Sequence, residues 1–541
     1  MTSLGRLKLL VVPILLLLLG AAMSLKMFPL YSGGGHYNFD ASYAYLFNGL
    51  LLLAQQVPHQ IDHPGTPLQA LIALLVYGQW LYLKLFYTVN PDVIVAVIAE
   101  PERYLLFISR VLLVLNVLAL FYFGKKIYQS SNSIFLTIFC QGSLLTYGIF
   151  GTKLLFPAPE ALVSCLSLCM LAVFSPLIFQ SAVDDKKLSK IAVTTGLIFG
   201  LGFAVKLTFL PLAALFLLLK TWRQLLLACV AAIAGWSLGV LPIVTRLPEL
   251  FKGAQNILIH TGKYGSGDQG FVDYSQLVGN FNALFKAFPL FYIAVVIFSF
   301  CAVALIGWLV ATQLTNAVKK STQVALSCNV QALKTIAVLL TVCVAQTLIV
   351  LKHFGQHYMI PALPVAFIGI AVLFKLLFEH KPRLGVILKA TLAVGVSAFV
   401  IQINYLTFVT LQAERVQHNR SVNSLQRELA KYQNPLVITS YGCYLPQCGV
   451  MFGIEYAPAI DKKAGSLLAN FYGFNVFNSM LLIDGHGFYP LNRLEPFFTA
   501  SRPVFLITRI DFPAFDLFKK ELVLTAEDQK LYKITGLVKS Q

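Results

Sequence analysis

The sequence predicts an all-α polytopic membrane protein that carries a small α/β domain at its C-terminal end. Of its 541 residues, 57% are hydrophobic and only 12% are charged, and the mean hydropathy is +0.75. A soluble domain has about twice this charged fraction. Several apolar runs approach the roughly 20 residues that a helix needs to cross a bilayer. Together these observations exclude a soluble globular protein.

Apolar runs separated by charged or Gly- and Pro-containing turns predict about eleven membrane-spanning helices in residues 1–409. They lie near 9–28, 103–123, 132–150, 157–180, 191–219 (two short helices that meet at "AVKLT"), 224–245, 288–312, 335–351, 358–378 and 386–409. The first segment also resembles a signal peptide, since Arg6 and Lys8 precede its apolar core and Gly20 and Ala22 follow it. We expect this segment to be retained as an anchor.

The run 66–83 is long enough to cross once more, and the distribution of Lys and Arg decides against this. With residues 31–102 as one external loop, five basic clusters face the cytoplasm, as the positive-inside bias favours. They are Lys125 with Lys126, Lys186 with Lys187 and Lys190, Lys220 with Arg223, Lys319 with Lys320, and Lys381 with Arg383. A full span at 66–83 would place them all outside. We therefore expect surface helices at 41–56 and 66–87, a cytoplasmic N-terminus and an external C-terminus.

The net charge of +18 follows from the same basic clusters. We expect no nucleic-acid binding, because no basic stripe alternates with exposed aromatic residues. Cys443 and Cys448 share a polar segment, where a lone Cys-x4-Cys pair is a weak zinc signal. A local disulfide fits better if this segment is extracytoplasmic. Six other cysteines lie in apolar runs and are expected to pack there: Cys140, Cys165, Cys169, Cys229, Cys301 and Cys343.

The chain changes character near residue 409. "LQAERVQHNRSVNSLQRELAKYQ" is typical of a polar helix, and short runs rich in β-branched residues follow it, such as "PLVITS" and "PVFLITRI". Gly- and Pro-containing turns separate these runs, as between strands. Residues 410–541 are therefore predicted to form a small extracytoplasmic α/β domain.

A set of polar and charged residues stands out because it borders apolar segments at the predicted outer face. The set comprises Asp40 and His63 in the external loop, Glu160 and Lys206 near the outer ends of spans, and Lys352, His353, His357 and Tyr358 in "LKHFGQHYMIPALP". Ionisable groups beside a bilayer are costly unless they are solvated, paired or used. Acids with a basic cluster at one interface suggest binding of a polar headgroup, since Lys pairs well with phosphate.

Each of these residues also has a purely structural interpretation. Asp40 can cap the helix that begins "ASYAYLF", or it can act as a general base or as a ligand of a divalent cation (Mg, Mn or Zn). His63 is held at a rigid corner by Pro64 and Pro67 and can be an ordinary interfacial residue. Lone lysines near helix ends usually extend to the headgroups. The whole set of polar and charged residues is predicted to lie at one face, and this convergence favours the functional interpretation.

Five short motifs along the chain, taken in their sequence order, resemble those of the GT-C superfamily of integral-membrane glycosyltransferases. The likeness is to the branch that contains protein O-mannosyltransferases and lipid A aminoarabinose transferases. "FDASYAY" is similar to the Asp and Tyr-Ala pair of that branch, and "HPGTPLQ" to a stretched His-Pro-Pro-Leu element. "APEAL", "GLIFGLGFAVKLTFLP" and "HYMIPALP" resemble its Pro-Asp, Gly-rich-with-Lys and basic-aromatic elements. The likeness covers roughly residues 10 to 378. Ala41 stands where many relatives carry a second acid.

The resemblance implies a GT-C-like fold. It also implies transfer of a sugar from a polyprenyl-phosphate donor to a lipid, glycan or protein acceptor, at the outer face of the bacterial inner (plasma) membrane. Asp40 would be the catalytic base or would help to hold a divalent cation. Lys206 and the basic group at 352–358 would neutralise the leaving phosphate, as stabilisation of a developing anion requires. His63 and Glu160 would shape the acceptor side.

Two other functions stay open on the sequence. A membrane transporter or lipid-linked-sugar flippase would show broken helices near mid-bilayer and an internal repeat, and the sequence shows neither. If the protein is instead a non-enzymatic scaffold whose function lies in the external tail, the variant Asp40→Asn should have no effect on product formation.

Overall fold

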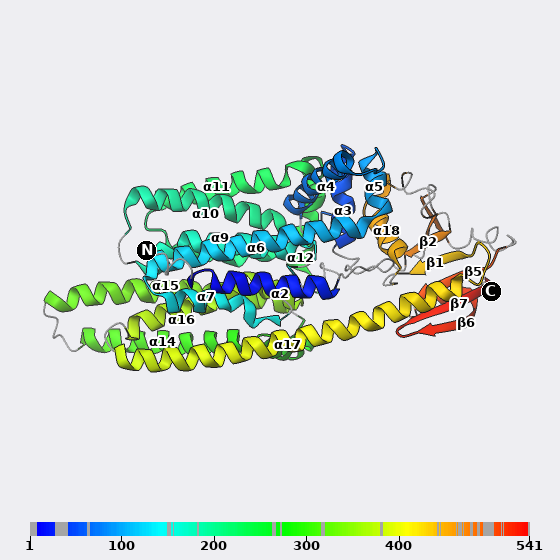
Figure 1. The fold of residues 1–541 in the computed structure, drawn as a ribbon. Coiled ribbons are helices and arrows are strands. Elements are labelled where there is room, and N and C mark those ends of the chain that lie inside the picture. The colour runs from blue at the N-terminus through cyan, green and yellow to red at the C-terminus, as the bar shows by residue number, and fades with distance from the viewer. Residues whose placement is uncertain are drawn as a thin grey trace.

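In a computed structural model, the chain folds into a bundle of long helices with a smaller sheet domain at one end (Figure 1). The structure describes residues 8–27, 42–61, 65–148, 153–154, 156–180, 183–261, 267–270, 273–314, 320–378, 382–440, 443, 445–460, 463, 468, 470–475, 480–483, 487–490, 502–509, 511 and 513–538. We call the end of the bundle beside the sheet domain the domain-facing end.

The bundle confirms the predicted all-α polytopic class. Its members are α2 (Val11–Met27), α6 (Pro101–Ser131), α7 (Ile134–Gly142) with η2 (Ser143–Thr146), α9 (Pro159–Phe179), α10 (Asp185–Val205), η3 (Leu207–Leu218), α11 (Trp222–Val240) with η4 (Leu241–Arg246), α14 (Pro289–Leu314), α15 (Lys320–Lys352), η6 (Gln356–Ala362), α16 (Leu363–Phe378) and α17 (Pro382–Leu429). Among the described residues, eight helices are long and apolar enough to cross a membrane, or nine if one bent pair counts as a span.

The predicted number of eleven spans is not confirmed, because several predicted spans correspond to short apolar helices. These are Val11–Ala22, Ile134–Thr146 and Leu207–Leu218. The last is η3, a 3₁₀ helix of 12 residues. At about 2.0 Å per residue a 3₁₀ helix of this length extends about 24 Å, which is longer than the same residues reach as an α-helix.

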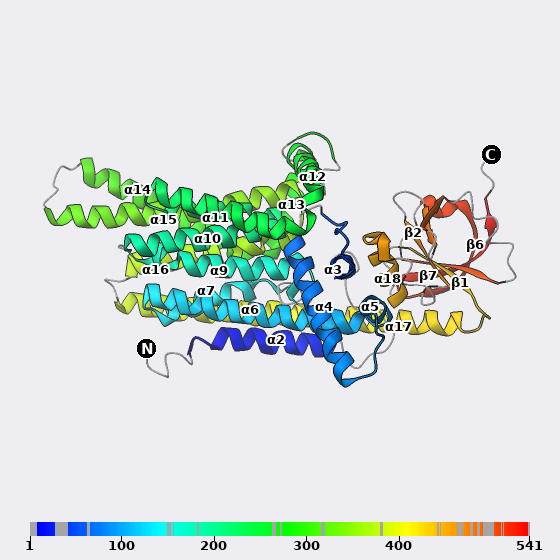
Figure 2. The same ribbon diagram turned by 90° about the horizontal axis from the view of Figure 1, so that it is seen from above.

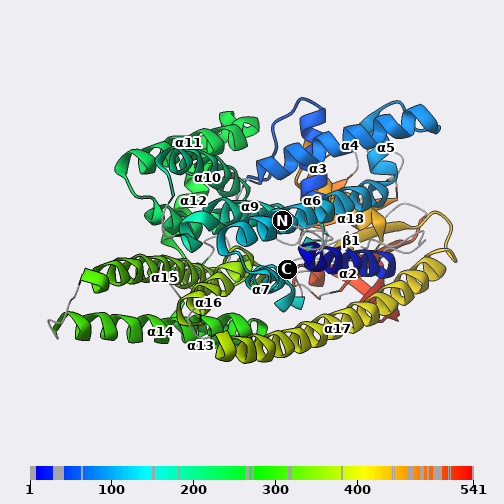
Figure 3. The ribbon, with the colours of Figure 1, turned by 60° about the vertical axis from the view of Figure 1, so that its left-hand side comes forward.

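Small residues allow α10 and α11 to lie against each other at one edge of the bundle, opposite α14 and α17 (Figure 3). A Cβ at Gly200 would lie 2.0 Å from the Ala232 carbonyl oxygen, and one at Gly235 would lie 2.4 Å from the Leu197 carbonyl oxygen. Larger side chains would therefore force the backbones apart. This use of glycine is typical of helix pairs in membranes, where close van der Waals packing replaces the hydrophobic effect.

Five further helices gather at the domain-facing end (Figures 1 and 2). They are α3 (Ala44–Leu53), α4 (Thr66–Phe86), α5 (Val93–Ala99), α12 (Leu247–Ile259) and α13 (Tyr274–Ala287). Helices α3 and α4 correspond to the predicted surface helices. Although α4 is long and apolar enough to cross a membrane, it runs across the bundle axis in Figure 2, as expected for a helix that lies on the surface. It begins after Gly65, whose φ of +66° favours glycine.

The C-terminal domain contains a mixed seven-stranded sheet in the order β4-β3-β2-β1-β5-β7-β6. Its strands are β1 (Leu436–Ser440), β2 (Phe471–Asn475), β3 (Met480–Ile483), β4 (Gly487–Pro490), β5 (Val504–Thr508), β6 (Phe518–Ala526) and β7 (Gln529–Leu537), with α18 (Pro446–Glu455), η7 (Pro458–Ile460) and η10 (Pro513–Leu517) between them. β1 is parallel to β2 and β5. The predicted α/β domain is thus present, and α17 runs without a break through the predicted boundary at 410.

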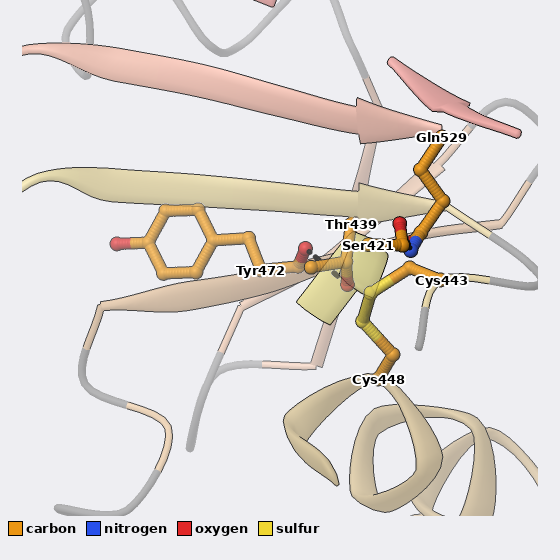
Figure 4. The surroundings of a disulfide bond; sticks show 6 residues. All are labelled: Ser421, Thr439, Cys443, Cys448, Tyr472 and Gln529. Carbon is orange, nitrogen blue, oxygen red and sulfur yellow. Dashed lines mark hydrogen bonds between the residues drawn. A yellow bond between two sulfur atoms is a disulfide. The ribbon is translucent and has the colours of Figure 1, made fainter. Parts of the chain in front are cut away.

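A disulfide and two buried hydrogen bonds help to hold this domain together (Figure 4). The predicted disulfide between Cys443 and Cys448 is present and joins the end of β1 to α18. On α17, the buried Ser421 hydroxyl donates to the Ala526 carbonyl and accepts from Gln529 Nε2 at 2.6 Å. The long helix α17 is therefore tied to β6 and β7 by buried hydrogen bonds.

Candidate active site

Glu160 and Lys206 form a buried ion pair at the domain-facing end of the bundle. Glu160 lies in the first turn of α9 after Pro159, where an acid interacts favourably with the helix dipole. Lys206 ends α10, and its extended backbone turns the chain into η3. Lys206 Nζ donates a hydrogen bond to Glu160 Oε1, and each side chain is only 7% exposed. The structure thus joins two residues that lie far apart in the sequence.

The 3₁₀ helix η6 completes this group, which we call the Glu160 cluster: Glu160, Lys206, His357 and Tyr358. His357 Nε2 lies 3.4 Å from Glu160 Oε1. Lys206 Nζ lies 4.5 Å from the centre of the Tyr358 ring, a cation–π contact. The four residues come from α9, the end of α10, and η6. The structure thus brings four of the predicted site residues together, and their position at one membrane face stays a prediction.

Gln346 sets the position of η6 relative to η3. Its Nε2 donates to the Tyr358 carbonyl at 2.7 Å and to the Thr208 carbonyl at 3.2 Å. The side chain is fully buried on α15. Sequence reasoning missed Gln346, because one amide in an apolar helix does not reveal its partners. Lys153 and Tyr147, also missed, lie close enough to Glu160 to interact with it electrostatically.

Lys352 and His353 make a second group at the same end of the bundle. Lys352 Nζ donates to the Leu258 carbonyl, and His353 Nε2 lies 2.9 Å from the Ile257 carbonyl. Both acceptors belong to the last turn of α12, where a cation interacts favourably with the helix dipole. The end of α15 therefore holds the end of α12. The roles of Lys352 and His353 towards a phosphate stay a prediction.

Asp40 and His63 lie outside the described residues, and the structure describes the chain beside each. Before α3, Tyr43 OH donates to Glu102 Oε1 of α6 at 2.6 Å. After α3, the fully buried Asn48 fixes the loop that leads towards His63. Its Oδ1 accepts from the backbone amides of His59 and Gln60 at 2.7 and 3.0 Å.

Two further side chains hold this loop from neighbouring helices. Gln69 Nε2 of α4 donates to the Gln60 carbonyl at 2.8 Å. Arg246, at the end of η4, donates to the Pro58 and His59 carbonyls at 2.9 and 3.1 Å. Sequence reasoning identified neither, since both act on backbone atoms distant from any motif. The path from α3 to the predicted His63 corner is thus fixed by side chains from several elements.

The metal expectation does not gain support from the Glu160 cluster. Across the described part of the chain, no three His, Cys, Asp or Glu residues are grouped so that they could hold a metal ion. Glu160 Oε1 already faces an ammonium and an imidazole, which suits a carboxylate that balances positive charge better than a metal ligand. A divalent cation at Asp40 stays a prediction.

The chain resembles known proteins in its structure and not detectably in its sequence. No protein-family model matches the chain, and no curated protein matches its sequence. The crystal structure of ArnT from Cupriavidus metallidurans bound to undecaprenyl phosphate is similar, with a TM-score of 0.53 and 11% identity over 98% of each chain. The apo structure of the same protein has a TM-score of 0.51, with 11% identity over 98% of this chain and 99% of that one. The chain therefore has the fold of ArnT, as the GT-C resemblance predicts.

Proposed function

We propose that the chain is a GT-C-type glycosyltransferase that moves a sugar from a polyprenyl-phosphate donor to an acceptor at the outer face of the membrane. The observation that carries this proposal is a buried ammonium group, Lys206, held by Glu160 at the domain-facing end of a fold shared with ArnT. That ArnT structure contains undecaprenyl phosphate. A lipid phosphate needs cations near the membrane surface, and the proposal assigns this role to Lys206 and Lys352.

In the proposed reaction, the acceptor hydroxyl oxygen attacks the anomeric carbon and Asp40 takes the hydroxyl proton. The bond between the anomeric carbon and the phosphate oxygen breaks, and its electron pair leaves with the lipid phosphate. Attack opposite to the leaving group inverts the anomeric centre. Positioned cations stabilise the charge that develops on the departing oxygen, which is usually the largest contribution to catalysis.

Glu160 suits a role in positioning the Lys206 ammonium for this purpose. An ammonium group has three N–H donors. One is directed at Glu160 and the ring of Tyr358 covers another side, so one donor is left for a phosphate oxygen among the described contacts. Because Lys206 is buried, its charge would act in a medium of low dielectric constant, where it stabilises an anion more than it would in water.

The test compares the glycolipids and cell-surface glycans of cells with and without this chain by mass spectrometry. The proposal expects one glycan class to lose a sugar when the chain is removed, and the Asp40→Asn variant to insert normally but fail to restore it. Full restoration by Asp40→Asn would remove the catalytic assignment. Lys206→Ala or Lys352→Ala should weaken binding of undecaprenyl phosphate more than binding of the acceptor identified in this way; the opposite ranking would refute the phosphate site.

A further inference from the structure

Helix α18 of the C-terminal domain lies directly on α3 of the first external loop (Figures 1 and 2). Gly449 and Gly453 lie one turn apart on α18, and Tyr43 and Phe47 lie one turn apart at the start of α3. A Cβ at Gly449 would lie 2.5 Å from Tyr43 Cζ, and one at Gly453 would lie 2.5 Å from Phe47 Cδ2. Both rings are fully buried. Only glycine therefore allows this approach.

Polar contacts set how α3 and the C-terminal domain lie along each other. Asn48 Nδ2 donates to the Tyr456 carbonyl, just after α18, at 3.2 Å. The same Asn48 accepts the two amides of the loop after α3 through its Oδ1. Nearby, Lys463 Nζ lies 2.6 Å from Asp92 Oδ2, which caps α5. Packing of glycines against rings would by itself allow α18 to slide along α3. The hydrogen bond and the ion pair are directional and therefore fix one position of α18 along α3.

Helix α18 is itself firmly held by its own domain. The disulfide between Cys443 and Cys448 links its first turn to the end of β1. Both cysteines are buried, as is Ile454 on the same helix. A displacement of α18 would therefore have to move the sheet with it. This makes α18 a rigid support for α3.

The opposite ends of α3 lead to the two loop segments of the proposed reaction. Asp40 precedes α3 closely in the chain, and Tyr43 at its start is held to α6 through Glu102. Asn48 in its middle holds the loop that leads to His63. A shift of α3 would consequently displace Tyr43 and the loop at His59 and Gln60, while the Glu160 cluster lies on other elements, α9, the end of α10 and η6.

We infer that Gly449 and Gly453, together with Tyr43 and Phe47, are positioning residues through which the C-terminal domain aligns the first external loop with the transfer site. This inference rests on the proposed function. It assigns the C-terminal domain a task in catalysis, namely to hold α3 against the bundle. A misplacement of about 1 Å at a reacting group can lower the rate about 100-fold.

The experiment uses the full-length protein and the variant Gly453→Ala, whose methyl group would overlap Phe47. The matched control is Gly536→Ala in β7 of the same domain, where the nearest atom to the added Cβ is Lys519 Cδ at 3.9 Å. We expect faster hydrogen exchange in α3 and about 100-fold slower product formation for Gly453→Ala. Its affinity for undecaprenyl phosphate should stay that of the wild type, because the Glu160 cluster is untouched. Gly536→Ala should match the wild type in all three measurements.

A Phe47→Ala background tests whether the ring itself transmits the effect. Once the ring is absent, adding Gly453→Ala should change neither hydrogen exchange nor product formation further. The inference is overturned if Gly453→Ala equals the wild type, if the control falls equally, or if the losses add in the Phe47→Ala background. Absence of any product with the wild type overturns the proposed function instead, and hydrogen exchange of α3 then still decides whether α18 holds α3.

Discussion

Removal of the Glu160 carboxylate is the sharpest test of how the candidate site is built. Glu160→Gln keeps the shape of the side chain but leaves the Lys206 ammonium buried without its counter-charge. Both side chains are 7% exposed, so water screens the pair little. Breaking a buried pair by removing one partner typically costs about 3–5 kcal/mol of folding free energy. We expect the loss of folding free energy in Glu160→Gln and in Lys206→Met to fall in this range. A protonated His357, which lies beside Glu160, would reduce the loss in Lys206→Met.

The double variant Glu160→Leu/Lys206→Met distinguishes pairing from general packing. Replacing a buried ion pair by apolar residues of similar volume is often neutral or stabilising. The double variant should therefore recover most of the loss seen in each single variant. Unfolding of the purified protein in mixed micelles by added sodium dodecyl sulfate, followed by circular dichroism, gives these free energies.

An exposed pair at the same end of the bundle serves as the control. Arg246 and Glu249 also form an ion pair, but the Glu249 side chain is 58% exposed. Glu249→Gln should leave the unfolding free energy close to that of the wild type, since exposed pairs contribute little. Losses in the double variant that equal the sum of the single losses would refute the argument. So would a Glu160→Gln variant as stable as Glu249→Gln.

Two further predictions concern the C-terminal domain. Burial raises the pKa of the Glu455 carboxyl from its ordinary 4.5 to about 7, so the folded state binds more protons between these values and stability falls as the pH rises through this window. Thermal melting at several pH values measures this fall in stability, and Glu455→Gln should abolish it. A wild type that is equally stable at about pH 5 and about pH 8 would contradict the prediction. Cys443→Ser/Cys448→Ser opens a short disulfide loop and should lower domain stability by about 2 kcal/mol; limited proteolysis with and without reductant measures this, and equal cleavage rates would contradict it.

Much of the bundle could be predicted from the sequence, because hydropathy and charge are properties of local segments. The runs that became α6, α9 and α11, and the run that became η6 and α16 together, are apolar over the length of a bilayer, whatever their neighbours. The orientation of α4 was harder, since its 21 residues would permit a crossing. There the distribution of Lys and Arg across distant loops gave the prediction of a surface helix. The number of spans could not be predicted in this way, because amino-acid composition does not reveal how far a short helix or a 3₁₀ helix extends across the membrane.

The candidate site was predicted only as a set of residues at one face. Glu160 and Lys206 were placed on different sides of the reaction, and the structure joins them in one ion pair. Lys352 was grouped with His357, and the structure directs its ammonium to the end of α12. These pairings depend on how α9, α10, α12 and α15 pack, which no local pattern specifies.

The sequence by itself determined which segments prefer lipid and which polar residues are out of place beside them, while the side of the membrane that their loops favour stays a prediction. These follow from transfer free energies that each segment carries alone. Only the tertiary structure decided which of those polar residues meet, and that Gly449 and Gly453 receive the rings of Tyr43 and Phe47. Such contacts join residues that are distant in the sequence, and their energies depend on ångström-scale distances that exist only once the chain has packed.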